Sequence, residues 1–194
     1  GIFFIGTNDL TSSIYKAHVV GGQVEIVDKV TEAYSKERKT QGINAMAVSQ
    51  SKEYFIVSHL PTLQDVRFLT VYTIQGAFAS SVQFENSLEY VWPLGANGFL
   101  IVDRKANIYA LVKQENGLFA PSILSRSKEQ IVTADFHKET NQLILVKPDH
   151  KIEILEVSKD RSIVEKQTMQ FDDFSSEITA VKYLPDHNWL VVGN

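Results

Sequence analysis

A short pattern recurs four times in this chain: an apolar segment ends, a polar turn follows, and a second apolar run begins. The turns lie 44, 44 and 47 residues apart and centre on Glu53, Asn97, Asn141 and Asn188. A fixed period in this range, filled by short β-type segments, is typical of propeller blades. The repeat therefore predicts a radial array of small sheets.

Each copy of the pattern is long enough for four strands. In the copy around Asn141, the segments 131–136, 142–146, 152–157 and 162–171 are rich in β-branched and other apolar residues and are separated by polar turns. Such residues favour strands, and Gly, Asn and Asp favour the turns between them. Strands joined in order by short turns form the antiparallel meander of a propeller blade.

We therefore predict an all-β fold, a β-propeller of four-stranded antiparallel blades. The chain is expected to supply about four blades of a larger ring of about seven. The predicted boundaries are 1–30 for a partial blade, 43–86, 88–130 and 131–171 for three complete blades, and 178–194 for a second partial blade. In a composite alternative, 178–194 pairs with 1–30 and closes a four-bladed ring, which leaves one second strand redundant.

The third copy fits the pattern less well at its first strand. Tyr90 and Trp92 fall in register, but Ser87 stands where the other copies have an apolar residue, and Leu88 takes that place after a one-residue slip. Aromatic residues recur with the blade period. We expect them to pack between sheets, because each blade buries both faces against its neighbours. They are Trp92, Phe99, Phe136, Tyr183 and Trp189.

Charge and composition argue against several classes of protein. The net charge of −4 disfavours a general nucleic-acid binder, which needs a basic surface. The chain has no cysteine, so disulfides and thiolate metal sites are excluded and a reducing compartment, cytoplasm or nucleus, is expected. Apolar runs such as 99–102 are far shorter than the roughly 20 residues of a membrane-spanning helix, so no membrane insertion is expected. The chain begins and ends inside apparent strands, which suggests part of a larger protein.

Residues 178–190 read Ile-Thr-Ala-Val-Lys-Tyr-Leu-Pro-Asp-His-Asn-Trp-Leu. This resembles the first strand and turn of the WD-repeat (Trp-Asp repeat) family of β-propellers, roughly Val-x-x-Val-x-Phe-Ser-Pro-Asp-Gly-x-x-Leu. Residues 149–152, Asp-His-Lys-Ile, are similar to the family's Asp-x-x-Ile turn before the third strand. No Trp-Asp dipeptide occurs, and no Gly-His precedes a first strand. The resemblance therefore implies a divergent repeat that lacks the family's Asp-His-Ser-Trp network.

Two long loops are predicted on one face of the propeller. Because successive strands run in opposite directions, connections between blades and those between second and third strands leave from the same face. Residues 31–42 and 60–67 are such connections and border the same blade. Long loops on a rigid scaffold often carry binding groups, although solvated loops without a function have the same composition. The candidate partner-binding residues are Tyr34, Lys36, Arg38, Lys39 and Arg67.

Other polar groups give weaker signals. The acidic connector 172–177 could bind a cation or a basic peptide, but it lacks the ligand spacing of a calcium loop and equally fits a solvated connector. The five histidines have no ligand spacing, so no metal site and no cofactor are expected. Asp135 and Lys182 hold the same place in successive first strands. Outward polar positions, or a charge pair across the central channel, would account for both.

The WD-repeat resemblance implies a non-catalytic scaffold that binds other proteins as part of a larger complex. A propeller enzyme with a metal in its channel is the first alternative. It would need several Asp, Glu, Asn or His side chains that converge on the axis. The equivalent first-strand places instead hold Ala47, Val91, Asp135 and Lys182, so we expect no catalytic residues.

A propeller in a ribonucleoprotein, which contacts RNA through basic loops, is the second alternative. The basic residues that the predicted topology gathers on the loop face are Lys36, Arg38, Lys39, Arg126 and Lys128. Three acidic residues dilute this charge: Glu32, Glu37 and Glu129.

Overall fold

The computed structural model describes residues 2–8, 11–33, 41–60, 67–158, 160–172, 176–184, 187 and 189–193. In this part of the chain, 17 β-strands form five antiparallel sheets and no α-helix occurs. Three of the sheets have four strands, which confirms the predicted all-β fold of four-stranded antiparallel units.

The strands of each sheet lie side by side in chain order. The first sheet consists of β1 (Ile2–Gly6), β2 (Ser13–Val20) and β3 (Gln23–Glu32). The second consists of β4 (Gln41–Val48), β5 (Tyr54–Leu60), β6 (Arg67–Thr73) and β7 (Phe78–Phe84). The third consists of β8 (Leu88–Leu94), β9 (Gly98–Asp103), β10 (Ile108–Lys113) and β11 (Phe119–Ser125). The fourth consists of β12 (Thr133–His137), β13 (Gln142–Lys147), β14 (Lys151–Val157) and β15 (Ile163–Gln170). The fifth consists of β16 (Ala180–Leu184) and β17 (Trp189–Gly193).

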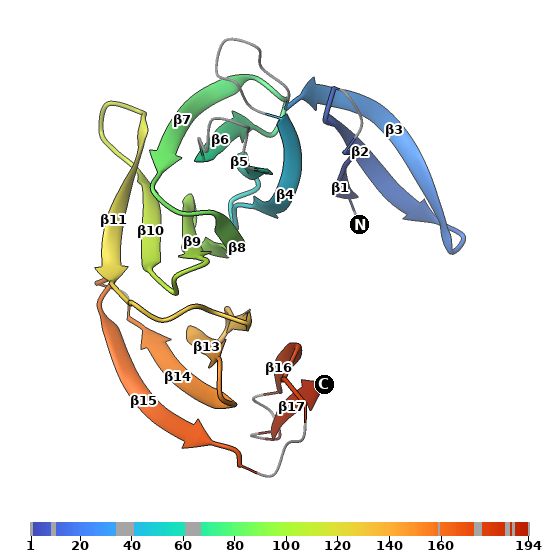
Figure 1. The fold of residues 1–194 in the computed structure, drawn as a ribbon. Helices are drawn as coiled ribbons and strands as arrows, with labels where there is room; N and C mark the ends of the chain where they lie inside the picture. Colours follow the sequence, from blue (N-terminus) through green and yellow to red (C-terminus); the bar gives the residue numbers. More distant parts are fainter. Residues whose placement is uncertain are drawn as a thin grey trace.

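The five sheets follow one another around an arc (Figure 1). β4 and β8 lie on the concave side, and the last strands of the complete sheets, β7, β11 and β15, lie on the outside. We label the strands of a complete sheet A to D from the inside outwards. The first and fifth sheets are separate, so the described residues do not form the pairing that a four-bladed closure would need.

The B strands form the centre of each sheet. All six residues of β9 are buried, and so are five of the six residues of β13. Both faces of these strands are covered by neighbouring sheets, which explains why they read as continuous apolar runs. In contrast, the outer strand β15 is mostly exposed.

Four hydrophobic clusters fill the spaces between consecutive sheets. Successive side chains of a strand point to opposite faces, so one B strand serves two clusters. Phe55 packs toward the first sheet with Ile14, whereas Ile56 packs toward the third sheet with Phe99. Each complete sheet is therefore fixed to both of its neighbours by apolar contacts.

Four of the five periodic aromatic residues pack between sheets as predicted. Phe99, Phe136 and Tyr183 are buried, and Trp92 packs against the cluster between the third and fourth sheets. The prediction is wrong for Trp189, whose exposed fraction is 63%. Trp189 begins β17, which is the edge of a two-stranded sheet in the described chain, and its ring contacts His187 instead.

The irregular start of the third copy is a β-bulge. Leu88 is buried and begins β8, and the register with β9 shifts between Leu88 and Tyr90. The slip inferred from Ser87 is thereby confirmed. The connection before β4 is shorter than the predicted 31–42, because β3 continues to Glu32 and β4 begins at Gln41.

A buried polar residue lies at the last or second-last position of the B strand in each complete sheet: His59, Asp103 and Lys147, spaced 44 residues apart. His59 Nδ1 donates to the Gly42 carbonyl, and its Nε2 lies 2.9 Å from Thr70 Oγ1. Lys147 Nζ lies 2.7 Å from carboxylate oxygens of both Glu129 and Glu153. In each case the residue bonds to the start of its own A strand or to the segment just before it.

Asp103 has the largest set of donors among the three. Its carboxylate accepts hydrogen bonds from the backbone N–H groups of Lys105 and Asn107 and from the side chains of Asn86, Asn107 and Tyr109. Burial, and then the charge and hydrogen bond of Asp103, raise the pKa of Tyr109 to about 12. These polar groups fix the B–C turn of the third sheet against its A strand.

Candidate interaction surface

The A–B and C–D turns of the complete sheets lie on one face, which we call the AB/CD face. The B–C turns and the connections between sheets lie on the opposite face, because successive strands are antiparallel. The two faces therefore offer independent surfaces on one rigid framework.

A groove of about 730 Å³ lies on the AB/CD face, over the junction of the third and fourth sheets. The third sheet contributes the turn 94–98 and residues 112–115. The fourth sheet contributes Lys138 and Asn141 from its A–B turn, and Ser158 and Arg161 from its C–D turn. Gln50 of the second sheet completes the rim. Its volume is within the usual range of ligand pockets, and every contributing sheet has all four strands.

The A–B turns of the second and third sheets are bonded to each other next to this groove. Asn97 Nδ2 donates to Glu53 Oε2 at 3.0 Å, and Ser51 Oγ donates to Asn97 Oδ1. Ser51 N also donates to the Ala96 carbonyl at 2.9 Å. These contacts join equivalent positions of neighbouring repeats and fix the turn that forms the groove floor.

Lys113 is held at the groove edge by an aromatic residue of the second sheet. Its Nζ donates to Tyr54 Oη at 2.7 Å and lies 4.9 Å from the centre of the Tyr54 ring. The phenol oxygen, and to a smaller extent the charges of Tyr54 and Glu53, raise the pKa of Lys113. An ammonium has three N–H donors, so two remain for another partner.

Arg161 lies in the C–D turn of the fourth sheet with a φ of 65°. Its N–H donates to the Ser158 carbonyl at 2.9 Å, while Ser158 N donates to the Ser162 carbonyl. The corresponding turns of the second and third sheets have the same two bonds, with Gly76 (φ 93°) and Gly117 (φ 83°) at this position. This is the three-residue hairpin turn whose last loop residue is left-handed. Arg161 thus occupies a position that favours glycine.

The acidic groups around the groove are engaged within the fold. Asp160 accepts from Ser158 Oγ, Ser162 N and Ser162 Oγ, and these bonds lower the pKa of its carboxyl group. Glu139 pairs with His137 and with Lys138. Within the described chain, Lys113 and Arg161 have no carboxylate partner. The lining thus contains three cations, Lys113, Lys138 and Arg161, and one acid, Glu115.

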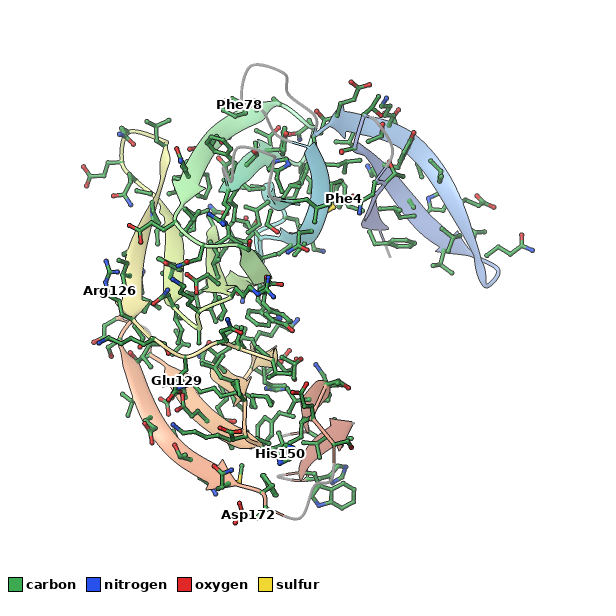
Figure 2. All side chains as sticks on the ribbon, viewed as in Figure 1. Phe4, Phe78, Arg126, Glu129, His150 and Asp172 are labelled. Atoms are coloured by element: carbon green, nitrogen blue, oxygen red, sulfur yellow. The ribbon has the colours of Figure 1, made fainter. Side chains whose placement is uncertain are left out.

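A second concavity of about 1090 Å³ lies at the concave side of the arc. Phe3 and Phe4 of β1 form one wall, and Phe4 stacks on Phe55 with ring centres 5.2 Å apart. Figure 2 shows Phe4 on this concave side. β1 is the edge of a three-stranded sheet, at the place where the complete sheets have an A strand. The walls of the groove on the AB/CD face, in contrast, belong to sheets with all four strands.

The loop corner predicted from the sequence stays a prediction. Tyr34, Lys36, Arg38 and Lys39 lie outside the described residues. Arg67 is described, and its guanidinium donates to the Glu85 carbonyl at 2.9 Å and to Ser87 Oγ at 3.4 Å. It therefore ties β6 to the connector that precedes β8. The acidic connector is also only partly described, since 173–175 lie outside that range.

The basic residues that were considered for RNA binding are likewise only partly described by the structure. Arg126 and Lys128 are exposed on the connector between β11 and β12, while Lys36, Arg38 and Lys39 lie outside the described range. Glu129 lies on the same connector (Figure 2) and pairs with Lys147. Lys147 and Lys151 lower the pKa of Glu129.

Asp135 and Lys182 form an ion pair between neighbouring strands, whereas the sequence suggested either outward polar positions or a pair across the central channel. Lys182 Nζ lies 2.8 Å from Asp135 Oδ1, and Tyr183 N donates to Asp135 Oδ2 at 3.1 Å. The pair joins neighbouring strands β12 and β16 at the inside of the arc. Among the described residues, no group of three or more His, Cys, Asp or Glu side chains could hold a metal ion. No helix in the same residues is long and apolar enough to cross a membrane.

No protein-family model and no curated protein matches the chain. Among solved structures, it is similar to the β-propeller domain of Cps50 (Swd1) from Myceliophteria thermophila, with a TM-score of 0.66 and 12% sequence identity. The alignment covers 97% of this chain and 58% of that domain. The fold is a partial β-propeller. The five sheets are therefore blades, and the chain spans a little over half the length of the propeller that it matches.

The sequence did not single out Arg161, although a signal was present. Alignment of the three C–D turns places Arg161 in register with Gly76 and Gly117. A long cationic side chain at a glycine position is an exception within the repeat. The A–B turns carry the period of the repeat, whereas the exception at Arg161 is visible only when the C–D turns are aligned position by position.

Proposed function

We propose that this protein is a non-catalytic scaffold that binds other proteins within a larger assembly, and that it is a divergent propeller of the WD-repeat type. The observation that carries the proposal is the groove on the AB/CD face. Complete blades bound it, bonds between blades fix its floor, and its lining combines cations with the amides of Gln50, Gln114 and Asn141. Polar groups placed on a rigid framework are typical of binding sites.

The likeness to the Cps50 (Swd1) propeller domain supports the framework on which this role depends. A propeller presents two faces at once, which suits a protein that holds several partners together. The corner around Arg67 is the second surface of this proposal, on the opposite face. Two surfaces on opposite faces would allow two partners to bind without competing.

The test compares three forms of the full-length protein in affinity capture. One is the wild type, and one is a groove variant that combines Lys113→Ala, Lys138→Ala and Arg161→Gly. The third, matched for charge, combines Arg104→Ala, Lys105→Ala and Lys128→Ala on the opposite face, where all three residues are exposed. A captured protein is then purified and mixed with each form, and the mass of the complex is measured by light scattering after gel filtration.

The proposal expects a complex of defined stoichiometry with the wild type and with the matched control, but not with the groove variant. A complex that all three forms make equally well would place the interaction away from the groove. If no purified protein forms a complex with any form, the scaffold role itself is contradicted.

A further inference from the structure

We propose that the groove between the third and fourth blades binds an extended acidic segment of a partner protein, and that Arg161 is its main specificity residue. This inference rests on the proposed function, and it adds the chemical class of the partner and the residue that selects it.

The side chains that line the groove carry more positive than negative charge. Three cations line it against one carboxylate, that of Glu115, although the chain as a whole has a net charge of −4. The nearby carboxylates of Glu53, Glu139 and Asp160 already accept hydrogen bonds or ion pairs within the fold. Lys113 and Arg161 therefore offer N–H donors without a carboxylate partner in the described chain. A ligand that carries carboxylates supplies hydrogen-bond acceptors for both side chains.

Arg161 has a left-handed backbone conformation. The equivalent C–D turns place glycine here, with φ values of 93° and 83°, and Arg161 itself has a φ of 65°, in the left-handed region where a residue with a side chain is strained. The side chain of Arg161 is exposed and has no bond within the described chain that would offset this strain. Strained residues that persist in a fold are concentrated at functional sites. The guanidinium can bind a carboxylate through two parallel hydrogen bonds, which gives it geometric selectivity that lysine lacks.

The residues that line the groove suit an acidic peptide better than a single-stranded nucleic acid. Single-stranded nucleic acids are bound by cations together with exposed aromatic rings on which bases stack. The described residues that line the groove include no aromatic side chain, and its other polar groups include the amides of Gln50, Gln114 and Asn141. These groups can bond to the peptide backbone. The observations therefore favour an extended polypeptide.

Fluorescence anisotropy with a labelled hexaglutamate peptide tests the inference on the full-length protein. We expect the wild type to bind the peptide, and binding to weaken as salt is raised, because the contacts are exposed ion pairs. Arg161→Gly is expected to weaken binding about tenfold through the loss of a bidentate charged contact. The same variant is expected to raise the melting temperature by about 2–4 °C, because it relieves the backbone strain.

Three controls make the result decisive. Arg104→Ala removes the same charge from the opposite face and should change hexaglutamate binding less than about twofold. Lys113→Ala should weaken binding without the rise in melting temperature, because Lys113 is not at a left-handed position. Labelled hexalysine should not bind.

Three outcomes would overturn the inference. One is a wild type that does not bind hexaglutamate. The second is an Arg161→Gly protein that is more stable but binds the peptide as tightly as before. The third is a groove that binds labelled oligouridylate more tightly than hexaglutamate, with sensitivity to Arg161→Gly. If hexaglutamate fails while a purified partner still depends on the groove, only the acidic chemistry is wrong and the scaffold role stands.

Discussion

Asn86 Nδ2 lies 2.8 Å from Asp103 Oδ2, and this bond joins the connector before β8 to the end of β9. Asp103 is fully buried and accepts bonds from four further donors in the same turn. The equivalent positions in the neighbouring blades, His59 and Lys147, make the same kind of link with different chemistry. In each complete blade, one buried polar residue thus links the end of the B strand to the start of the A strand or to the segment just before it.

Replacing Asp103 should therefore destabilise the protein severely. Asp103→Ala leaves the donors of Asn86, Asn107 and Tyr109 without their acceptor in a buried site, and we expect a loss of about 3 kcal/mol or more in the free energy of unfolding. This loss is measured by urea denaturation, with tryptophan fluorescence as the signal. Asp28→Ala, at an exposed position of β3, should change the same quantity by less than about 0.5 kcal/mol. A loss below about 1 kcal/mol for Asp103→Ala would contradict the assigned role.

The period and the apolar pattern were enough to predict the fold. Apolar residues at B-strand positions such as Phe55, Phe99 and Leu143 recur every 44 residues, because each must fill the same space between blades. Even the bulge at Leu88 left a visible slip in the sequence. The apolar positions of the core repeat at a constant interval, and such an interval is visible in a single sequence.

The polar features could not be predicted in the same way. His59, Asp103 and Lys147 share a position but differ in charge and in donors, so no single motif marks them. The position could have been found only by asking where a polar residue interrupts the apolar B strand at a constant interval. Arg161 was missed for a related reason: it stands at a left-handed position where the equivalent turns have glycine, and its residue type alone does not show this.

The turns with left-handed glycine allow a matched comparison of strain with steric clash. Gly117 has a φ of 83° and open space around an added Cβ, so Gly117→Ala should cost only the backbone strain, about 1 kcal/mol. Gly76 has a φ of 93°, and its Cβ would lie 2.3 Å from the Val30 carbonyl oxygen of the first blade. Gly76→Ala should therefore cost clearly more, about 3 kcal/mol. Equal losses in urea denaturation would mean that the first blade shifts freely against the second.

The ion pairs of the fourth blade predict a dependence of stability on acid. Burial disfavours the charged form of Glu153, but its hydrogen bonds to Lys147 and Lys151 prevail and lower its pKa below the ordinary value for a glutamate. A carboxyl group with a lowered pKa contributes stability that is present above the unfolded-state pKa and is lost as pH falls through the folded-state value. The free energy of unfolding should therefore decrease from about pH 4.5 downwards.

Glu153→Gln isolates this contribution. The variant should be less stable than the wild type at pH 7, and the difference should shrink as pH falls below about 4.5, because the wild type then loses the same charge. Glu156→Gln, which removes a half-exposed partner of Lys166, is the matched control and should change stability little at either pH. The measurement is a series of urea unfolding curves between pH 7 and pH 3. A difference between wild type and Glu153→Gln that stays constant with pH would contradict the assignment.

Asp135 and Lys182 form an ion pair, but the two residues should contribute unequally to the free energy of unfolding. The side chain of Lys182 is 62% exposed, so Lys182→Ala should cost at most about 1 kcal/mol. Asp135 is buried and also accepts from Tyr183 N, so Asp135→Ala removes a hydrogen bond to a buried N–H and should cost about 2 kcal/mol. With the double variant, urea denaturation completes a double-mutant cycle. Because Lys182 and Asp135 are in contact, the two losses should add to more than the loss in the double variant. Strict additivity would show that the pair does not couple the fourth blade to the fifth, and that Asp135 acts through the Tyr183 N–H alone.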